Sequence, residues 1–217
     1  MQGDTINQES LVKTLKKFKY IQSDAVEKAF YAVDRAQFVL PEHIPRAYVN
    51  TALPILHDQT ISTPSIVATM LEVSNLKPGL NTLEIGCGSG YNVALIAEIV
   101  GEEHVITIER IPELAKWGQK NLKSAGYNIT VVIKDGTKGY PEKALYDRII
   151  STAAAPKIPD SWVEQVKVGG LIVSPVGPKW WYQELEVGKK MEDGTLDIIY
   201  HGEVSFVPLV GEEGHAP

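Results

Sequence analysis

A short apolar stretch leads directly into a glycine-rich turn at residues 82–91, which reads Thr-Leu-Glu-Ile-Gly-Cys-Gly-Ser-Gly-Tyr. Gly86, Gly88 and Gly90 tolerate positive backbone φ angles and let a ligand approach the main chain closely. The helical run that follows, residues 92–100, would present unpaired N–H groups to a carboxylate or a phosphate. The junction therefore predicts a binding site for a nucleotide-type cofactor.

The spacing of the glycines is Gly-x-Gly-x-Gly, whereas dinucleotide-binding turns use Gly-x-Gly-x-x-Gly. Tyr91 occupies the position where a dinucleotide fold needs its third glycine for close packing of helix and strand. Glu84 lies just before the first glycine, where its carboxylate would repel a pyrophosphate and would suit a cationic ligand. A nicotinamide-dependent oxidoreductase is therefore the weakest of the functions that the turn allows.

Acidic residues follow two further apolar stretches. Val105–Glu109 predicts a buried parallel strand, and Glu109 lies roughly 20 residues beyond the turn, where doubly wound sheets bring a carboxylate to ribose hydroxyls. A third strand over 130–133 is followed by Asp135 and Gly136. Taken singly, Glu109 reads as a solvated strand end and Asp135 as an Asp-Gly turn. Their joint spacing favours one ligand site at the carboxyl edge of a parallel sheet.

Over about residues 80–175 these features resemble the class I S-adenosylmethionine-dependent methyltransferases. That family has a glycine-rich first turn, an acid ending the second strand and an acid in the loop after the third. The resemblance implies S-adenosylmethionine as cofactor, with its methionine moiety at the glycine turn, its ribose at Glu109 and its adenine at Asp135. A sulfonium cation without phosphates also tolerates nearby acids. The cofactor contacts that we expect are Thr60, Glu84, Gly86, Cys87, Gly88, Glu109, Arg110, Asp135 and Gly136.

Composition restricts the class of protein. The chain has 217 residues, of which 44% are apolar and 22% charged, which fits one sizeable α/β domain. A net charge of −6 argues against nucleic acid as a partner. The single cysteine, Cys87, excludes an internal disulfide framework, and the five histidines show no metal-ligand spacing, so we expect no metal. No apolar run approaches the length of a membrane span and no signal peptide pattern begins the chain, so we expect a cytoplasmic monomer without membrane contact.

Hydrophobic periodicity divides the chain into three regions. Residues 1–60 predict an N-terminal helical cap, residues 61–211 the methyltransferase core, and residues 212–217 a loose tail. The fold class expected is α/β, with a doubly wound, mostly parallel Rossmann-like sheet and antiparallel C-terminal edge strands. Helices are expected over 8–18, 24–33, 64–73 and 92–100, and strands over 82–85, 105–109, 130–133, 146–151, 171–176, 183–187, 196–200 and 204–207.

Four flanking segments resemble one subfamily, the protein-L-isoaspartate O-methyltransferases, over roughly residues 10–211. This resemblance implies transfer of a methyl group to the side carboxylate of L-isoaspartyl residues in damaged proteins and peptides, giving a methyl ester and S-adenosylhomocysteine. The segments are Gln-Thr-Ile-Ser-Thr-Pro at 59–64, Glu-Arg-Ile-Pro-Glu-Leu at 109–114, Ser-Thr-Ala-Ala-Ala-Pro at 151–156 with Ile-Pro at 158–159, and Pro-Val-Gly at 175–177 with Phe-Val-Pro-Leu at 206–209.

This chemistry asks little of the protein beyond binding. A side carboxylate with a pKa near ~4 is already an anion at neutral pH, so no general base is required. Neutral hydroxyl groups can orient it without holding it as firmly as a lysine or arginine would. The resemblance implies that Ser62 is the catalytic residue, with Thr60 beside it. We also expect residues 206–209 and 152–156 to pair with a flexible peptide by strand addition. The substrate contacts that we expect are Thr60, Ser62, Thr152, Ala153 and Val207.

Ser62 also has a purely structural interpretation. A serine or threonine before a proline at the first helical position is a common helix N-cap, so the hydroxyl of Ser62 or Thr63 would satisfy backbone N–H groups. The chain also departs from the family pattern at residues 54–58, Pro-Ile-Leu-His-Asp, where a glycine-containing run is usual. A methyltransferase with a small-molecule acceptor and a non-catalytic S-adenosylmethionine-binding module therefore remain as alternatives.

Overall fold

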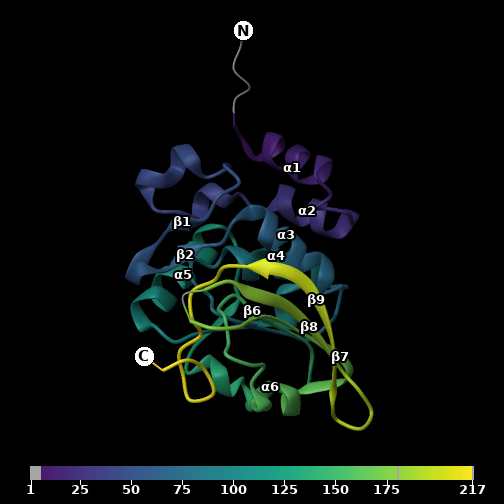
Figure 1. The fold of residues 1–217 in the computed structure, drawn as a ribbon. Helices are drawn as coiled ribbons and strands as arrows, with labels where there is room; N and C mark the ends of the chain where they lie inside the picture. The colour runs from purple at the N-terminus through teal and green to yellow at the C-terminus, as the bar shows by residue number, and fades with distance from the viewer. Residues whose placement is uncertain (1–5, 180, 217) are drawn as a thin grey trace.

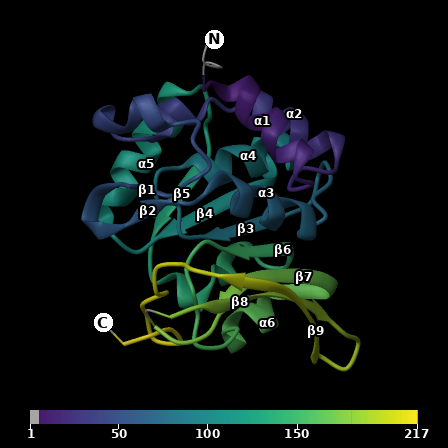
Figure 2. The same ribbon diagram turned by 45° about the horizontal axis from the view of Figure 1, so that its top comes forward.

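The computed structural model describes residues 6–179 and 181–216, and its centre is a seven-stranded sheet. The strand order is β5-β4-β3-β6-β7-β8-β9, which can be followed from top to bottom in Figure 2. The strands β3 to β7 are parallel to one another, whereas β8 pairs antiparallel with both β7 and β9 at the end of the sheet. The sheet confirms the predicted fold class. Its strands are β3 Thr82–Ile85, β4 Val105–Glu109, β5 Thr130–Ile133, β6 Tyr146–Ser151, β7 Val166–Val176, β8 Gln183–Lys190 and β9 Leu196–Val204.

The chain reverses direction across the sheet beside β3. From β3 it runs through α4 (Tyr91–Val100) to β4 and through α5 (Pro112–Ser124) to β5, then crosses to β6 on the other side of β3. The short helix α6 (Asp160–Gln165) leads from β6 to β7 and covers the opposite face, where Trp162 is completely buried. Such a reversal leaves a crevice at the carboxyl ends of the strands, where ligands of doubly wound folds bind.

The N-terminal helices α1 (Gln8–Lys17) and α2 (Asp24–Ala32) lie above α3 (Pro64–Val73) and α4, far from α6 (Figure 1). Each has one apolar face, and Leu11 and Leu15 of α1 are buried in the same cluster as the α4 residues. Short 3₁₀ helices at Arg35–Phe38 and Pro41–Arg46 complete this layer. The arrangement is consistent with a cap that shares the core of the domain.

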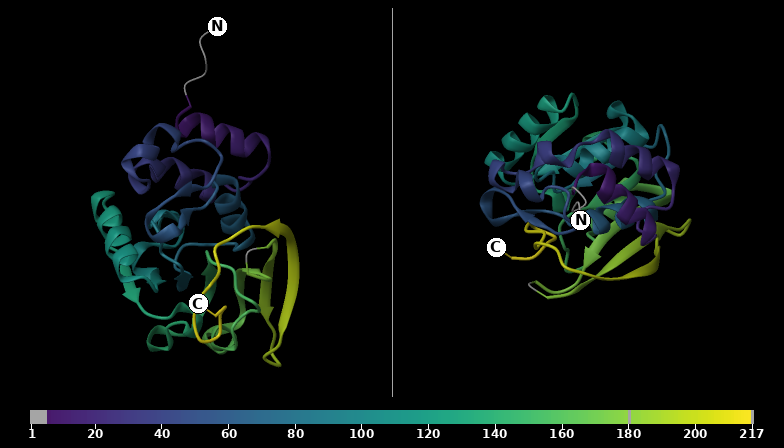
Figure 3. Two further views of the ribbon diagram at one scale, coloured as in Figure 1. Left: turned by 60° about the vertical axis from the view of Figure 1, so that its left-hand side comes forward. Right: turned by 90° about the horizontal axis from the view of Figure 1, so that it is seen from above.

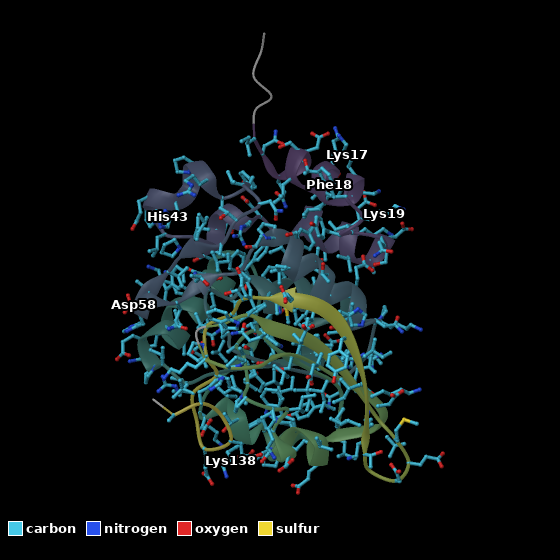
Figure 4. The ribbon with its side chains drawn as sticks, in the orientation of Figure 1. Lys17, Phe18, Lys19, His43, Asp58 and Lys138 are labelled. Atoms are coloured by element: carbon cyan, nitrogen blue, oxygen red, sulfur yellow. The ribbon has the colours of Figure 1, made fainter. Side chains whose placement is uncertain are left out.

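Residues 53–61 form a small hairpin that the sequence reading did not anticipate. Strand β1 (Leu53–Pro54) pairs antiparallel with β2 (Thr60–Ile61), with a 3₁₀ turn over Leu56–Asp58 between them. His57 and Asp58 both have φ of 56°, an uncommon conformation for residues other than glycine. Asp58 points outward at the edge of the molecule (Figure 4). The segment that departs from the family pattern, residues 54–58, therefore includes the tip of the hairpin.

The C-terminal segment, residues 205–216, corrects two expectations. Strand β9 is continuous from Leu196 to Val204, and the predicted separate strand over 204–207 is wrong, because Phe206 donates to a side chain, Gln183 Oε1, instead of a strand partner. The described part of the predicted tail is not loose, since the backbone of Glu212 and Glu213 donates to the side chains of Asp135 and Thr137. Pro217 lies outside the described residues. Figure 3 shows the segment running back along the edge of the sheet.

No helix within the described ranges is long and apolar enough to span a bilayer.

Candidate active site

A cavity of about 330 Å³ opens at the carboxyl ends of β3, β4 and β6, at the point where the strand order reverses. Its volume falls within the range of small-molecule sites. Nine of the residues predicted from the sequence line it, namely Thr60, Gly86, Gly88, Glu109, Arg110, Gly136, Thr152, Ala153 and Val207. Ser62, Glu84, Cys87 and Asp135 do not line it.

The glycine turn forms one wall of the cavity. Gly86, Gly88 and Gly90 have φ values of 95°, 53° and 91°, which explains the need for glycine at these positions. A Cβ atom at Gly86 would lie 2.4 Å from Thr152 Oγ1, so the cradle depends on the missing side chain. The N–H groups of Gly86 and Cys87 both donate to Ile108 O. These amides are therefore engaged inside the protein, and so are the carbonyl oxygens of Gly86 and Cys87, which accept from Thr152 Oγ1 and the Gly90 N–H.

Glu109 lies at the end of β4 beside the turn and is only 7% exposed. Its Oε2 accepts from the Gly88 N–H and its Oε1 from the Ile111 N–H, each at 3.0 Å. Each carboxylate oxygen can accept a further hydrogen bond, and Glu109 lines the cavity. The carboxylate is thus held rigidly at the rim of the cavity, in a position suited to two adjacent hydroxyl groups.

Glu84 is a correction to the predicted cofactor contacts. It is completely buried beneath the turn, where Oε1 accepts from Asn92 Nδ2 at 2.8 Å and Oε2 from Thr107 Oγ1 at 2.5 Å. Alternation along β3 turns this side chain toward α4 while Ile85 faces the other side of the sheet. Burial raises the pKa of Glu84 to about 8, so the carboxyl group is uncharged at neutral pH. Its hydrogen bonds connect β3 with β4 and α4.

Cys87 and Asp135 also differ from expectation. The Cys87 side chain is buried against α5, and burial raises the pKa of its thiol well above the ordinary value. Asp135 accepts from Thr137 N and Oγ1 through Oδ1 and from the Glu212 N–H through Oδ2. Its neighbour Gly136 does line the cavity, and a Cβ atom there would lie 2.6 Å from Ile85 Cγ2. The strand register thus delivers Gly136 to the cavity and turns Asp135 toward the C-terminal segment.

Ser62 is half-buried and does not line the cavity; it follows the cavity-lining Thr60 by two residues and precedes the start of α3 at Pro64. Thr63 is the N-cap residue of α3 but makes no side-chain capping bond. Within the described part of the chain, no hydrogen bond involves the hydroxyl of Ser62 or Thr63. The capping interpretation of these hydroxyls is therefore wrong, and the Ser62 hydroxyl is not committed to the helix.

The loop after β6 is less open to a peptide than we expect from sequence. Ala154 donates to Val207 O and accepts from the Leu209 N–H, each at 2.8 Å, so the two segments predicted to pair with a peptide pair with each other. Ala155 is likewise bonded to Pro175 and Gly177. Strand addition at Ala154 and Ala155 is therefore wrong, because their backbone groups are already satisfied.

Sequence reasoning missed several lining residues that come from distant segments. Lys179 follows β7, and its Nζ donates to Ala216 O at 2.8 Å. Leu114 of α5 and Ile108 of β4 add apolar surface, and periodicity marks these only as core residues. Residues 54–58, which depart from the family pattern, do not line the cavity; Gln59, directly after them, does, and Ile55 packs close to Gly88. No described group of three His, Cys, Asp or Glu side chains is placed to hold a metal.

The family model described as Protein-L-isoaspartate(D-aspartate) O-methyltransferase (PCMT) matches residues 6–214 of the chain. The protein-L-isoaspartate O-methyltransferase of Thermococcus onnurineus is 50% identical over 205 residues, covering 94% of this chain and 93% of that protein. The corresponding protein of Methanopyrus kandleri is 49% identical over 209 residues, covering 95% and 92%.

A solved structure agrees with the sequence relatives. The β-aspartate methyltransferase (PCMT) of Plasmodium falciparum, crystallised with S-adenosyl-L-homocysteine, superposes with a TM-score of 0.82 at 28% identity. The alignment covers 94% of this chain and 98% of that one. The similarity extends over the helical cap, the sheet and the C-terminal segment together.

Proposed function

Because the chain belongs to the protein-L-isoaspartate(D-aspartate) O-methyltransferase family, we infer that it repairs damaged proteins by methylating their L-isoaspartyl residues. The methyl group moves from S-adenosylmethionine to the isoaspartyl side carboxylate, which gives a methyl ester and S-adenosylhomocysteine. The adjacent backbone nitrogen then closes a succinimide without the enzyme, and hydrolysis returns some normal aspartate. We further propose that the protein acts in the cytoplasm as a monomer, on protein and peptide substrates and not on nucleic acid.

The residues that line the cavity fit S-adenosylmethionine. Gly86 and Gly88 leave room for close approach of a ligand to the main chain, and Glu109 is held with free lone pairs for the two ribose hydroxyls. Gly136 leaves space at the adenine end, because any side chain there would collide with Ile85. When bound, S-adenosylmethionine supplies an electrophilic methyl group on a positively charged sulfur.

The acceptor side of the proposed site holds neutral hydroxyl groups. Thr60 and Thr152 line the cavity from two different segments of the chain. Ser62 follows Thr60 by two residues, and its hydroxyl makes no hydrogen bond within the described residues. We assign Ser62 the role of orienting the acceptor carboxylate by donating a hydrogen bond, with Ala153 and Val207 along the peptide. Because the carboxylate is already ionised, these residues need only position it and exclude water.

One observation carries the assignment of the catalytic residue. Thr63, the N-cap residue of α3, makes no side-chain capping bond, and no hydrogen bond in the described structure involves the hydroxyl of Ser62, two residues after the cavity-lining Thr60. A helix start by itself would favour a hydroxyl that is hydrogen-bonded to backbone N–H groups, not a free one. A free hydroxyl next to the cavity is what orientation of an acceptor requires.

The first experiment uses methyl-labelled S-adenosylmethionine and two peptides that differ only in L-isoaspartate versus L-aspartate. We expect base-labile methyl ester on the isoaspartyl peptide alone. Ser62→Ala should lower the rate by roughly 10²-fold or more while S-adenosylhomocysteine still binds, because binding and orientation are separate contributions. Tight cofactor binding without label on the isoaspartyl peptide would contradict the repair function and would direct attention to a small-molecule acceptor.

A further inference from the structure

Asn50 lies outside the cavity, but its side chain reaches the helix that follows Ser62. Asn50 Oδ1 accepts from the Ser65 N–H at 2.9 Å, across 15 positions of sequence. Ser65 is the second residue of α3, and its N–H is a group that an N-cap hydroxyl normally takes. Asn50 therefore caps α3 from a distance and does what the hydroxyl of Thr63, the N-cap residue, would otherwise do.

The backbone on both sides of Asn50 is fixed by a buried guanidinium. Arg35 is 1% exposed, and it donates through Nε to Ala47 O at 2.9 Å and through Nη2 to Thr51 O at 3.2 Å. Its guanidinium carbon lies 5.3 Å from the ring centroid of Tyr91, the first residue of α4 after the glycine turn. The Asn50 side chain is thus presented from a rigid support that also packs on the cofactor side of the site.

The Asn50–Ser65 hydrogen bond closes a loop that contains the whole β1–β2 hairpin and Ser62. At its tip, His57 and Asp58 hold the left-handed conformation, which persists in residues other than glycine only when the surrounding structure enforces it. At its base, Leu53 pairs with Ile61. The bond at residue 50 therefore fixes the base of a strained loop at the place where the loop meets α3.

We propose that Asn50 is a positioning residue for methyl transfer. By capping α3 it keeps the nearby hydroxyls out of the helix terminus, and it fixes the segment from Thr60 to Ser62 beside the cavity. Asn50 touches neither substrate nor cofactor and acts only through Ser62. This inference rests on the proposed role of Ser62.

The test compares three variants, Thr63→Ala, Asn50→Ala with Thr63→Ala, and Asn50→Asp with Thr63→Ala. The Thr63 change is included because its hydroxyl is placed to take the vacated N–H, and by itself it should leave the rate unchanged. The Asn50→Ala pair should lower kcat for the isoaspartyl peptide by about ten-fold relative to Thr63→Ala, with S-adenosylhomocysteine affinity unchanged. Asn50→Asp should restore kcat, because its carboxylate still accepts the bond and suits a helix N-terminus.

A purely structural cap predicts a different result. In that case the Asn50→Ala pair would have a lower thermal midpoint but, assayed below that midpoint, the kcat of the Thr63→Ala control, and the inference would be overturned. In a Ser62→Ala background the Asn50→Ala change should have no further effect on kcat; an additional loss there would equally contradict action through Ser62. Failure of the proposed function is seen separately, as absence of isoaspartyl labelling by the unmodified protein. A Ser62→Ala variant that retains the full rate would remove the role of Ser62 and this inference with it.

Discussion

The carboxyl group of Glu84 is fully buried next to the proposed cofactor site. Burial raises its pKa to about 8, and the hydrogen bonds from Thr107 and Asn92 offset this only in part. Its ordinary pKa is 4.5, so between about pH 4.5 and 8 the folded protein binds a proton that the unfolded chain does not. Glu84 therefore makes stability fall as pH rises through that window.

Replacement of Glu84 by glutamine should remove this pH dependence. The amide keeps the shape of the acid, carries no charge and keeps an oxygen that can accept from Asn92 Nδ2. Relative to the unmodified protein, Glu84→Gln should gain at least about 1.4 kcal/mol between roughly pH 5.5 and 8.5, the value of one pKa unit. Urea unfolding at both pH values measures this, with the exposed Glu164→Gln as control. Parallel pH profiles would show that Glu84 ionises normally.

At the scale of elements, the packing of α5 against the glycine turn shapes the site. Gly118 is buried in the middle of α5, and a Cβ atom there would lie 2.7 Å from Gly88 O and 3.0 Å from Cys87 Sγ. Alanine is ordinarily favoured over glycine in a helix interior by roughly 0.5–1 kcal/mol. Here the short contact with backbone outweighs that preference, because α5 or the turn must move to accommodate the methyl group.

We therefore expect Gly118→Ala to destabilise the protein by about 1–3 kcal/mol and to weaken S-adenosylhomocysteine binding by roughly ten-fold. Lys120→Ala, on the exposed face of the same helix, should change neither by much. Thermal unfolding and calorimetric titration measure the two effects. An alanine variant with unchanged affinity would mean that the turn relaxes without loss of the site.

For the molecule as a whole, the C-terminal segment closes the sheet edge over the cavity. Val207 and Leu209 line the cavity, and farther along Glu212 N donates to Asp135 Oδ2 at 2.9 Å, across 77 positions of sequence. Lys138 adds an ion pair to Glu212 at 2.7 Å, at the foot of the molecule in Figure 4. Asp135 thus connects the turn after β5 with the end of the chain.

Removal of this connection should loosen the site. Asp135→Ala should accelerate amide hydrogen exchange over residues 207–216 and weaken S-adenosylhomocysteine binding by roughly ten-fold, because the segment that encloses the cavity loses its anchor. Asp193→Ala is a matched control, since Asp193 makes the same bonds to Thr195 that Asp135 makes to Thr137, but in the exposed β8–β9 turn. Weaker binding with unchanged exchange would instead favour a direct contact of Asp135 with the adenine.

Local pattern determined most of the secondary structure and half of the site. Short apolar runs separated by helical patterns predicted the parallel strands, and the proline at position 64 predicted the start of α3, because both are properties of neighbouring residues. Glycine spacing and the acid ending β4 located Gly86, Gly88 and Glu109 at the cavity, since parallel strands share a carboxyl edge. The glycine turn and the acids indicated the methyltransferase class, and four other short segments, such as residues 59–64, indicated the subfamily.

Tertiary structure alone decided which side chains face the ligand. Glu84 and Asp135, like Glu109, are acids at or near the ends of predicted strands. In the fold, however, Glu84 faces α4 and Asp135 faces the C-terminal segment, so neither lines the cavity. Asn50, 15 positions before Ser65, accepts from the Ser65 N–H, a group that an N-cap hydroxyl would otherwise take. Sequence specifies what a residue can do over short range. Orientation and competition for hydrogen-bond partners depend on residues that only the fold brings together.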